Sequence, residues 1–455
     1  MKVDIDRIRK YNVSGPRYTS YPTAVQFREQ FSSTSLENYL LSRNEKARDI
    51  SLYFHIPFCF SLCWYCGCTK IITRDQDRAD VYLDYLKSNM DQLLPILNNA
   101  SEVTQIHFGG GTPTFLDPGQ IHDLGESIKS RFKIGAGSEN SIEIDPRRLT
   151  RDHVRALRQA GFNRASIGVQ DTNKTVQEAV HRIQPQKTNR KVTGWLREEG
   201  FSSINIDLIY GLPRQTPELF EKTLEDVLEL DPDRIATYSY AHVPWIKPSQ
   251  KLIREQELPS TDDKLRMMKM AVERLIDEGY RYIGMDHFAK EDDELSKAYE
   301  EDTLQRNFQG YSTRARTDLY AFGMSGISQV GSLYFQNYKD LPRYYGELDK
   351  SHWPVQKTRW LSGDDRIRRE IIMQIMCKNF VSYDSFEERW EVSFHSYFKD
   401  EMEQLRRFAE DGLLAWYDNG FELTDEGRFF VRNIAMVFDR YLSQAKREKT
   451  FSKTV

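Results

Sequence analysis

The stretch Cys59-Phe-Ser-Leu-Cys63-Trp-Tyr-Cys66-Gly-Cys68 gathers four of the chain's five cysteines within ten residues. Thiolates are the ligands that zinc and iron–sulfur clusters prefer. A structural zinc site usually combines two ligand pairs that lie about a dozen or more residues apart, and this chain has no second cysteine pair. The Cys-x3-Cys-x2-Cys spacing instead suits three corners of one iron–sulfur cube, with the fourth iron left open. We therefore expect a cluster site, with a zinc knuckle or reactive thiols as the alternative.

Length and composition limit the class of protein. A chain of 455 residues can bury a large core, and we expect one large domain with a smaller one. The net charge is −4 with a pI of about 6.2, so no excess of basic residues points to nucleic acid. The mean hydropathy is −0.65, and the N-terminus lacks the apolar segment of a signal peptide. Clustered free cysteines suit a reducing compartment, so we expect a cytoplasmic protein without a membrane segment.

Strand-like runs recur between residues 51 and 330 with helical patterns between them. Helices fit the apolar stripe from Tyr82 to Leu97 and the segments Pro217–Leu230 and Asp262–Asp277. Alternating strands and helices predict a parallel sheet with right-handed crossovers, and this number of units predicts an α/β fold of the TIM-like barrel type, complete or partial. The predicted strands are Ser51–Ile56, Val103–Phe108, Ser141–Ile144, Ala165–Val169, Ile204–Ile209, Ile235–Tyr240 and Tyr280–Met285.

Polar residues stand where the predicted strands end, which is the active-site end of such barrels. The cysteine loop follows the first strand, Glu143 and Asp207 interrupt apolar strands, and Gln170-Asp171 end another. A carboxylate that points into a barrel is costly unless it is paired or binds a ligand. Several at one end favour a ligand site over the alternative of a structural ion pair.

The run Gly109-Gly-Gly-Thr-Pro-Thr114 follows the second predicted strand. It matches neither the dinucleotide fingerprint nor the phosphate loop. Three glycines allow the backbone to approach a ligand closely, although a bare turn would also use them. Its place beside the cysteine loop favours a ligand.

Two further segments flank the predicted barrel. Tyr11–Ala24 contains two prolines and a glycine, which exclude a regular element; alone, it would be interpreted as a packed loop. After about Asp364 the sequence becomes rich in helices and includes a hairpin around Asn419-Gly420, an arrangement of the winged-helix kind. Cys377 lies in an apolar run and is interpreted as inert helix core. We expect an N-terminal arm at 1–50, the barrel at 51–330 and a mostly helical C-terminal domain at 331–455.

The chain resembles the oxygen-independent coproporphyrinogen III oxidases (dehydrogenases) of the radical S-adenosylmethionine (SAM) superfamily along nearly its whole length. The resemblance rests on Tyr11–Ala24, on His55-Ile-Pro-Phe-Cys59 with the four cysteines, on Gly109–Thr114, on Gly284-Met-Asp-His-Phe288, on Arg306-Asn-Phe-Gln-Gly-Tyr311 and on Arg432-Asn433. The arm and the fourth cysteine are specific to that branch of the superfamily. The segment His242-Val-Pro-Trp-Ile-Lys-Pro is the least typical part.

The resemblance implies particular cofactor residues. It implies that Cys59, Cys63 and Cys66 hold a [4Fe–4S] cluster, while Cys68 is not a ligand. It also implies two SAM molecules. The cluster-bound SAM would contact Tyr53, Gly110, Glu143 and Ile327, and the second SAM would contact Tyr65, Gly111, Thr112, Gln170, Arg182, Asp207 and Ala241.

The implied activity is the anaerobic conversion of two propionates of coproporphyrinogen III to vinyl groups, which gives protoporphyrinogen IX in haem biosynthesis. The resemblance further implies a low-potential electron donor such as flavodoxin or ferredoxin, and we expect a monomer. Arg17 on the arm is a candidate cation for a substrate carboxylate. Two alternatives stay open at this point: a haem chaperone, which typically lacks the arm and the fourth cysteine, and a radical SAM methyltransferase that opens haem.

Overall fold

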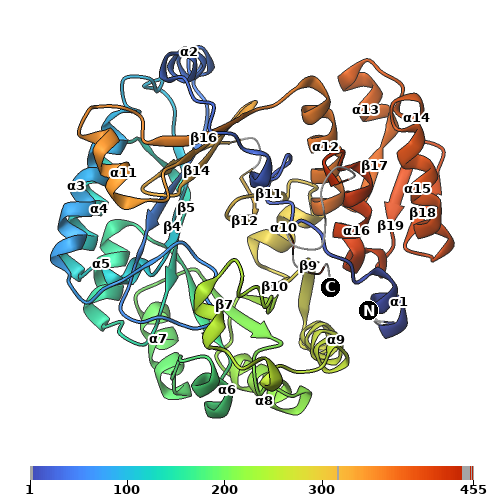
Figure 1. The fold of residues 1–455 in the computed structure, drawn as a ribbon, viewed down its shortest axis with the longest axis horizontal. Coiled ribbons are helices and arrows are strands. Elements are labelled where there is room, and N and C mark those ends of the chain that lie inside the picture. Colours follow the sequence, from blue (N-terminus) through green and yellow to red (C-terminus); the bar gives the residue numbers. More distant parts are fainter. Residues whose placement is uncertain (1–3, 315–316, 443–450, 452, 454–455) are drawn as a thin grey trace.

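The computed structural model describes residues 4–314, 317–442, 451 and 453 and contains a large α/β body and a C-terminal domain at its side (Figure 1). A 12-stranded sheet forms the centre of the body. Neighbouring strands at its middle run parallel in the order β13 (Asp318–Phe322), β1 (Ile50–Ile56), β4 (Val103–Gly110), β5 (Ile134–Ile144), β6 (Arg164–Gln170), β7 (Ser203–Tyr210) and β8 (Arg234–Ser239).

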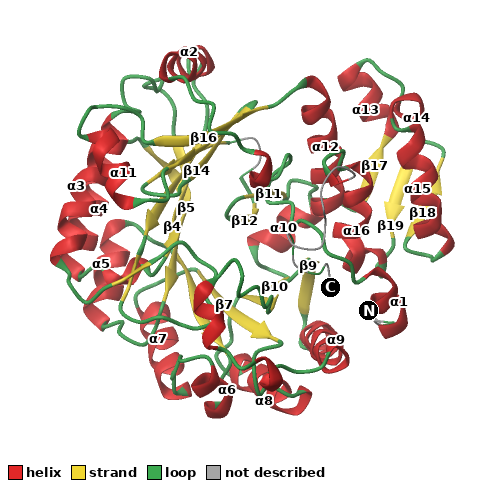
Figure 2. Ribbon diagram, viewed as in Figure 1, coloured by secondary structure: helices red, strands yellow, loops and turns green. Residues whose placement is uncertain are grey.

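Helices between these strands cover the outer face of the sheet, as alternating strands and helices require (Figure 2). Local sequence sets their ends: Asp117 caps α4 in a reciprocal pair with Gln120, and Gly161 ends α5 in the left-handed conformation. Two predicted helical segments, Pro217–Leu230 and Asp262–Asp277, are confirmed within two residues, whereas the third, predicted from Tyr82 to Leu97, ends at Asp91. The helices are α3 (Asp77–Asp91), α4 (Pro118–Arg131), α5 (Arg151–Ala160), α6 (Lys174–Ala179), α7 (Gln186–Glu198), α8 (Pro217–Leu228) and α9 (Thr261–Asp277).

The sheet departs from a simple parallel barrel at both edges. The predicted strand Tyr280–Met285 exists as β9 (Tyr280–Gly284), but β10 (His287–Lys290) lies between β9 and β8 and is antiparallel to both. The chain reverses within a tight turn in which Met285 has a φ of 53°, so β10 and not β9 reaches β8. Beyond β13 the antiparallel strands β14 (Ile327–Val330), β15 (Leu333–Asn337) and β16 (Val355–Trp360) extend the sheet. The barrel is therefore open between β16 and β9.

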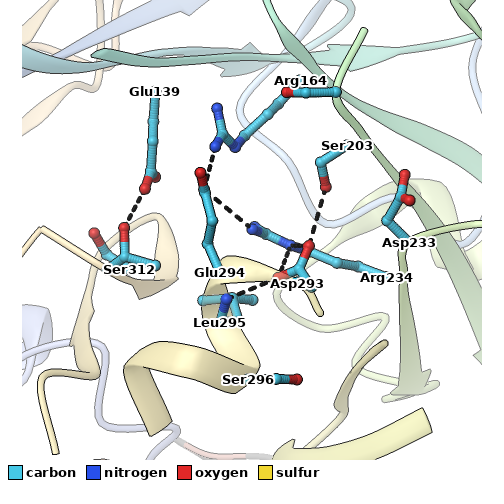
Figure 3. Close-up of polar contacts among 12 residues, drawn as sticks. Glu139, Arg164, Ser203, Asp233, Arg234, Asp293, Glu294, Leu295, Ser296 and Ser312 are labelled. Atoms are coloured by element: carbon cyan, nitrogen blue, oxygen red, sulfur yellow. Dashed lines mark hydrogen bonds and ion pairs between the residues drawn. The ribbon is translucent and has the colours of Figure 1, made fainter. Parts of the chain in front are cut away.

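Polar side chains close the end of the barrel where the parallel strands begin. Arg164 at the start of β6 pairs with Glu294, the first residue of α10 (Glu294–Glu300) (Figure 3). Arg234 at the start of β8 pairs with Asp293 at 2.9 Å, and Ser203 donates to the same carboxylate at 3.4 Å. These contacts satisfy the buried charges at the starts of β6 and β8 within the chain itself.

The C-terminal domain has the predicted winged-helix-like arrangement. Its sheet contains β17 (Phe380–Ser382), β19 (Gly420–Leu423) and β18 (Leu414–Tyr417). The predicted hairpin joins the last two, but its turn residues are Asp418-Asn419, one position before the predicted Asn419-Gly420, because Gly420 pairs with Tyr417. Cys377 is buried at the end of α12, as expected. The helices are α12 (Gly363–Cys377), α13 (Tyr383–Trp390), α14 (Phe394–Tyr397), α15 (Lys399–Glu410) and the short α16 (Val431–Ala435).

The N-terminal arm joins the C-terminal domain to the sheet. Residues 12–23 contain no helix or strand, whereas the predicted irregular segment Tyr11–Ala24 includes the last residue of α1 (Ile5–Tyr11) and the first of a 3₁₀ turn that precedes α2 (Ser33–Arg43). Asn433 donates to the carbonyl of Tyr11 at 2.8 Å, and Tyr18 donates to Asp439 at 2.9 Å. Tyr334 on β15 donates to the carbonyl of Tyr21 at 3.1 Å. The arm thus crosses the open side of the barrel.

Smaller elements complete the fold. They are β2 (Phe58–Cys59), β3 (Ile71–Ile72), β11 (Gln305–Asn307), β12 (Gly310–Ser312) and α11 (Leu341–Leu348). The division into domains at residues 1–50, 51–330 and 331–455 stays a prediction. The chain remains in the large sheet until Trp360.

Candidate active site at the end of the parallel strands

The cysteine loop and the glycine run pack against each other directly after β1 and β4. The Gly111 amide donates to the carbonyl of Ile56 at 2.8 Å, and the Thr112 amide donates to the carbonyl of Phe58 at 2.8 Å. The Cys59 thiol lies 3.3 Å from the Thr112 hydroxyl. A Cβ on Gly111 would lie 2.5 Å from the Pro57 carbonyl oxygen, so only glycine allows this contact between two backbones.

Two guanidinium groups approach the thiol of Cys63. Arg147 and Arg182 each place a terminal nitrogen 3.5 Å from the Cys63 sulfur. Asp145 lies between them and binds Arg147 at 2.5 Å and Arg182 at 3.2 Å. Burial alone would raise the pKa of Asp145, but the positive charges of Arg182 and Arg147 outweigh burial and hold it below its ordinary value. The carboxylate therefore stays charged and keeps both cations beside the loop.

Glu143 on β5 faces the space above the strand ends. Its carboxylate accepts from the Gly110 amide at 3.2 Å and lies 3.5 Å from Nε2 of His107. The ring of His107 stacks on Tyr53 with centroids 5.8 Å apart. The Glu143 side chain remains 46% accessible, although its own strand is buried on the outer face. It can therefore accept further hydrogen bonds from a ligand.

Asp207 on β7 has a different environment. It accepts hydrogen bonds from Ser166 and from the Asn205 amide group, both at 2.8 Å. Burial raises the pKa of Asp207 to about 6, and the charge of Glu143 adds to the rise. A hydroxyl or ammonium group of a ligand could donate to this buried carboxylate and stabilise its charged form.

Asp171 was predicted, together with Gln170, to lie at a strand end, but its carboxylate binds other groups of the chain and does not face the space beside Glu143. Its carboxylate accepts from the Gln215 side chain at 2.7 Å and from the Asn173 amide at 2.6 Å. Burial raises the pKa of Asp171 to about 6 as well. This carboxylate holds two loops together instead of facing a ligand.

Most of the predicted cofactor residues lie at the C-terminal ends of the parallel strands or in the loops that follow, whereas Tyr53 and Asp207 lie within β1 and β7. Ile327 begins the antiparallel strand β14, which is separated from the strand of Tyr53 by β13. Tyr65 packs against the apolar cluster that contains Tyr240, the neighbour of Ala241 in the chain. The structure therefore brings most of the predicted residues to one end of the sheet, although no ligand tests their individual roles.

Sequence reasoning missed several side chains at this end. His107, Asp145 and Arg147 had not been singled out. His107 could have been found, because it alternates with the buried Ile106 and Phe108 and must face the barrel interior. Asp145 and Arg147 lie in a loop, where no periodic pattern indicates which side chains reach the cysteines.

Comparisons with known proteins identify the family. A model of the radical SAM superfamily matches residues 53–227, and a model named the HemN C-terminal domain matches residues 361–430. The oxygen-independent coproporphyrinogen III oxidase of Escherichia coli K12 is 44% identical over 452 residues, which cover 99% of this chain and 98% of that protein. The chain belongs to the family of oxygen-independent coproporphyrinogen III oxidases.

A second relative and a solved structure support the same family assignment. The oxidase of Helicobacter pylori strain 26695 is 45% identical over 456 residues, which cover 100% of this chain and 99% of that protein. The solved structure described as coproporphyrinogen III oxidase (HemN) from Escherichia coli, a radical SAM enzyme, superposes with a TM-score of 0.92. That comparison covers 97% of this chain and 99% of the other at 43% identity. The expected partial radical SAM barrel is confirmed.

The donor set fits a [4Fe–4S] cluster. Cys59 and Cys63 are buried and Cys66 is partly buried, whereas Cys68 is exposed. Among the described residues no three thiol, imidazole or carboxylate groups converge as a single metal ion would require. Each corner of a cube binds a separate iron, so its thiolates need not converge. Arg147 and Arg182 supply positive charge to the sulfur, a means by which proteins tune such clusters.

Over the described ranges, no helix combines the length and hydropathy that crossing a bilayer would need.

Proposed function

We propose that this chain carries out the reaction of its family, the oxygen-independent oxidation of coproporphyrinogen III, at the C-terminal ends of the parallel strands. Two propionates become vinyl groups, and each loses CO2, one proton and two electrons, so the product is protoporphyrinogen IX. One observation supports this placement: the cysteines, the glycine run, Glu143 and Asp207 lie at one end of the barrel, whereas the charged side chains Arg164 and Arg234 at the other end are paired with carboxylates of the chain.

The proposed cofactor residues are those of the sequence prediction. Cys59, Cys63 and Cys66 would hold the [4Fe–4S] cluster, which with SAM supplies a 5′-deoxyadenosyl radical that abstracts hydrogen. Glu143 and the Gly110 backbone would hold the cluster-bound SAM with Tyr53 and Ile327. The second SAM would contact Tyr65, Gly111, Thr112, Gln170, Arg182, Asp207 and Ala241.

The chain's own part in catalysis is to position the substrate and to exclude water. A carbon radical must be shielded from competing reactions, so the site has to be closed during turnover. The arm Tyr11–Ala24 crosses the open side, and the C-terminal domain holds it through Asn433 and Asp439. Both segments would therefore act as walls of the reaction chamber.

Electrons would come from a low-potential protein such as flavodoxin or ferredoxin. Lys70 donates to the carbonyl of Cys66 at 3.4 Å, and Lys247 donates to the carbonyl of Gly67. Two cations thus lie at the rim of the cysteine loop, which would favour a donor with an acidic surface. We expect the chain to act as a monomer.

Anaerobic product analysis tests the proposal. Reconstituted enzyme with a reductant and an electron acceptor should convert coproporphyrinogen III to protoporphyrinogen IX and release CO2, methionine and 5′-deoxyadenosine in step. If the substrate persists while haem is bound, methylated or opened, the oxidase function is refuted.

A further inference from the structure

Three arginines from distant parts of the chain meet at the open side of the barrel. Arg17 comes from the arm, Arg306 from β11, and Arg432 from α16 of the C-terminal domain. Arg306 Nε donates to the carbonyl of Arg17 at 3.4 Å. Burial, followed by the positive charges of Arg17 and Arg306, lowers the pKa of Arg432 to about 9, which reflects how close the three cations are.

Arg432 forms hydrogen bonds with the backbone of the arm. It donates to the carbonyl of Pro16 at 2.9 Å, to the carbonyl of Lys453 at 3.0 Å and to the carbonyl of Gly15. These contacts fix the two residues that precede Arg17. Arg432 therefore positions the arm, and its guanidinium is directed to the backbone.

The Arg306 guanidinium has N–H donors that no acceptor of the described chain uses. Only 6% of the residue is accessible, yet its Nη1 has no hydrogen-bond partner among the residues that the structure describes. Its guanidinium lies over the ring of Tyr311, 4.6 Å from the centroid. An unpaired cation at this depth costs several kcal/mol unless an anion offsets it.

The local charges do not cancel. Arg17 pairs with Asp286, in the turn between β9 and β10. His287 contributes no positive charge, because burial and the charges of Arg306 and Arg17 lower its pKa well below the ordinary value. The guanidinium groups of Arg17 and Arg306 together with the Asp286 carboxylate leave an excess of positive charge. The Arg17 side chain nevertheless keeps 33% of its surface accessible, as expected for the wall of a cavity.

The arginines adjoin the proposed cofactor site through Tyr238 on β8. The Arg17 guanidinium lies 5.7 Å from the centroid of the Tyr238 ring. Burial and the negative charge of Asp207 raise the pKa of Tyr238, whereas Arg17 and Arg306 lower it, so this ring lies between the acidic and the basic groups. A small cavity of about 30 Å³ beside them is lined by Asp286 and Arg432.

We propose that Arg306 and Arg17 form a binding site for a propionate carboxylate of the substrate, held in place by Arg432. The inference rests on the proposed function, because coproporphyrinogen III carries four propionates that enter a closed site. Guanidinium groups bind carboxylates through paired hydrogen bonds, and Arg306 supplies the free donors. The substrate carboxylate would share Arg17 with Asp286 and neutralise the excess charge.

The test measures binding and not turnover. The probe is coproporphyrin III, the oxidised and fluorescent form with the same four carboxylates, and its tetramethyl ester serves for comparison. With cluster-loaded protein, Arg306→Gln should weaken coproporphyrin III binding about tenfold or more, as expected for the loss of hydrogen bonds to a charged group. Arg17→Gln should weaken it as well. Arg306→Lys should recover part of the affinity, because it keeps the charge but not the paired donors.

Arg164→Gln is the matched control. Arg164 is buried to a similar degree, with 9% accessible, but pairs with Glu294 at the opposite end of the barrel (Figure 3). It should leave coproporphyrin III binding unchanged, and SAM affinity and cluster absorbance should stay at wild-type values in all variants.

Two results would refute the carboxylate site: unchanged coproporphyrin III affinity in Arg306→Gln and Arg17→Gln, or an equal loss of affinity for the tetramethyl ester. Failure of the wild-type protein to bind coproporphyrin III would instead refute the proposed function. The two failures are therefore distinguishable.

Discussion

The substitution Asp207→Asn tests whether the Asp207 carboxylate binds a ligand or only stabilises the fold. Burial raises the pKa of Asp207 to about 6 from its ordinary 3.8. A pKa raised by folding means that the fold prefers the protonated form, so the contribution to stability is complete below about pH 4 and is lost as pH rises through about 6. A shift of about 2 units at about 1.4 kcal/mol per unit gives at most about 3 kcal/mol.

The amide removes this penalty and can keep the existing hydrogen bonds. Its oxygen can accept from Asn205, and its amino group can donate to the Ser166 hydroxyl, which can rotate. Without SAM, the melting temperature of Asp207→Asn should therefore match wild type near pH 4 and exceed it by a few degrees at pH 8. Differential scanning fluorimetry across this range measures the difference.

SAM binding should respond in the opposite direction. Loss of a hydrogen bond to a charged group costs about 2 kcal/mol, or about thirtyfold in affinity, which isothermal titration can measure anaerobically. Asp171→Asn is the control, because Asp171 has a similarly raised pKa of about 6 but accepts from Gln215 and from the Asn173 amide, which are N–H donors. An amide there should lower the melting temperature and leave SAM affinity unchanged. A less stable Asp207→Asn at pH 8 with wild-type SAM affinity would refute the reasoning.

Six further substitutions, in three groups, test the same site. Cys59, Cys63 or Cys66 replaced by alanine should abolish the iron–sulfur absorbance near roughly 400 nm, whereas Cys68→Ala should keep it; loss in Cys68→Ala would contradict the ligand assignment. Gly111→Ala should displace the cysteine loop and lower cluster occupancy, measured as iron per chain, because its Cβ would lie 2.5 Å from the Pro57 oxygen. Glu143→Gln should weaken SAM binding about tenfold with little change in melting temperature, and the reverse pattern would assign Glu143 a structural role.

Several features could be predicted because they depend on residues close together in the chain. The cysteine spacing lies within one loop, and the alternation of strands and helices appears as local periodicity, so the cluster site and the parallel core from β1 to β8 were both predictable. The exclusion of regular structure from residues 12–23 follows from their prolines and glycine alone.

Other features required the folded chain. Whether Tyr280–Gly284 reaches β8 depends on a reversal at Met285, and β14 to β16 join the sheet only because β13 pairs with β1. Short strands at a sheet edge carry little periodicity of their own, so their partners decide where they lie.

The groups around the reacting space were decided only by tertiary structure. Arg147 and Arg182 reach Cys63 from 84 and 119 residues away, and Arg432 reaches Pro16 across 416 residues. A sequence pattern shows that an arginine is present and on which face of an element it lies, but not which distant group shares its space. That choice follows from burial, because a buried charge is tolerated only where the fold brings an acceptor or leaves room for an anionic ligand.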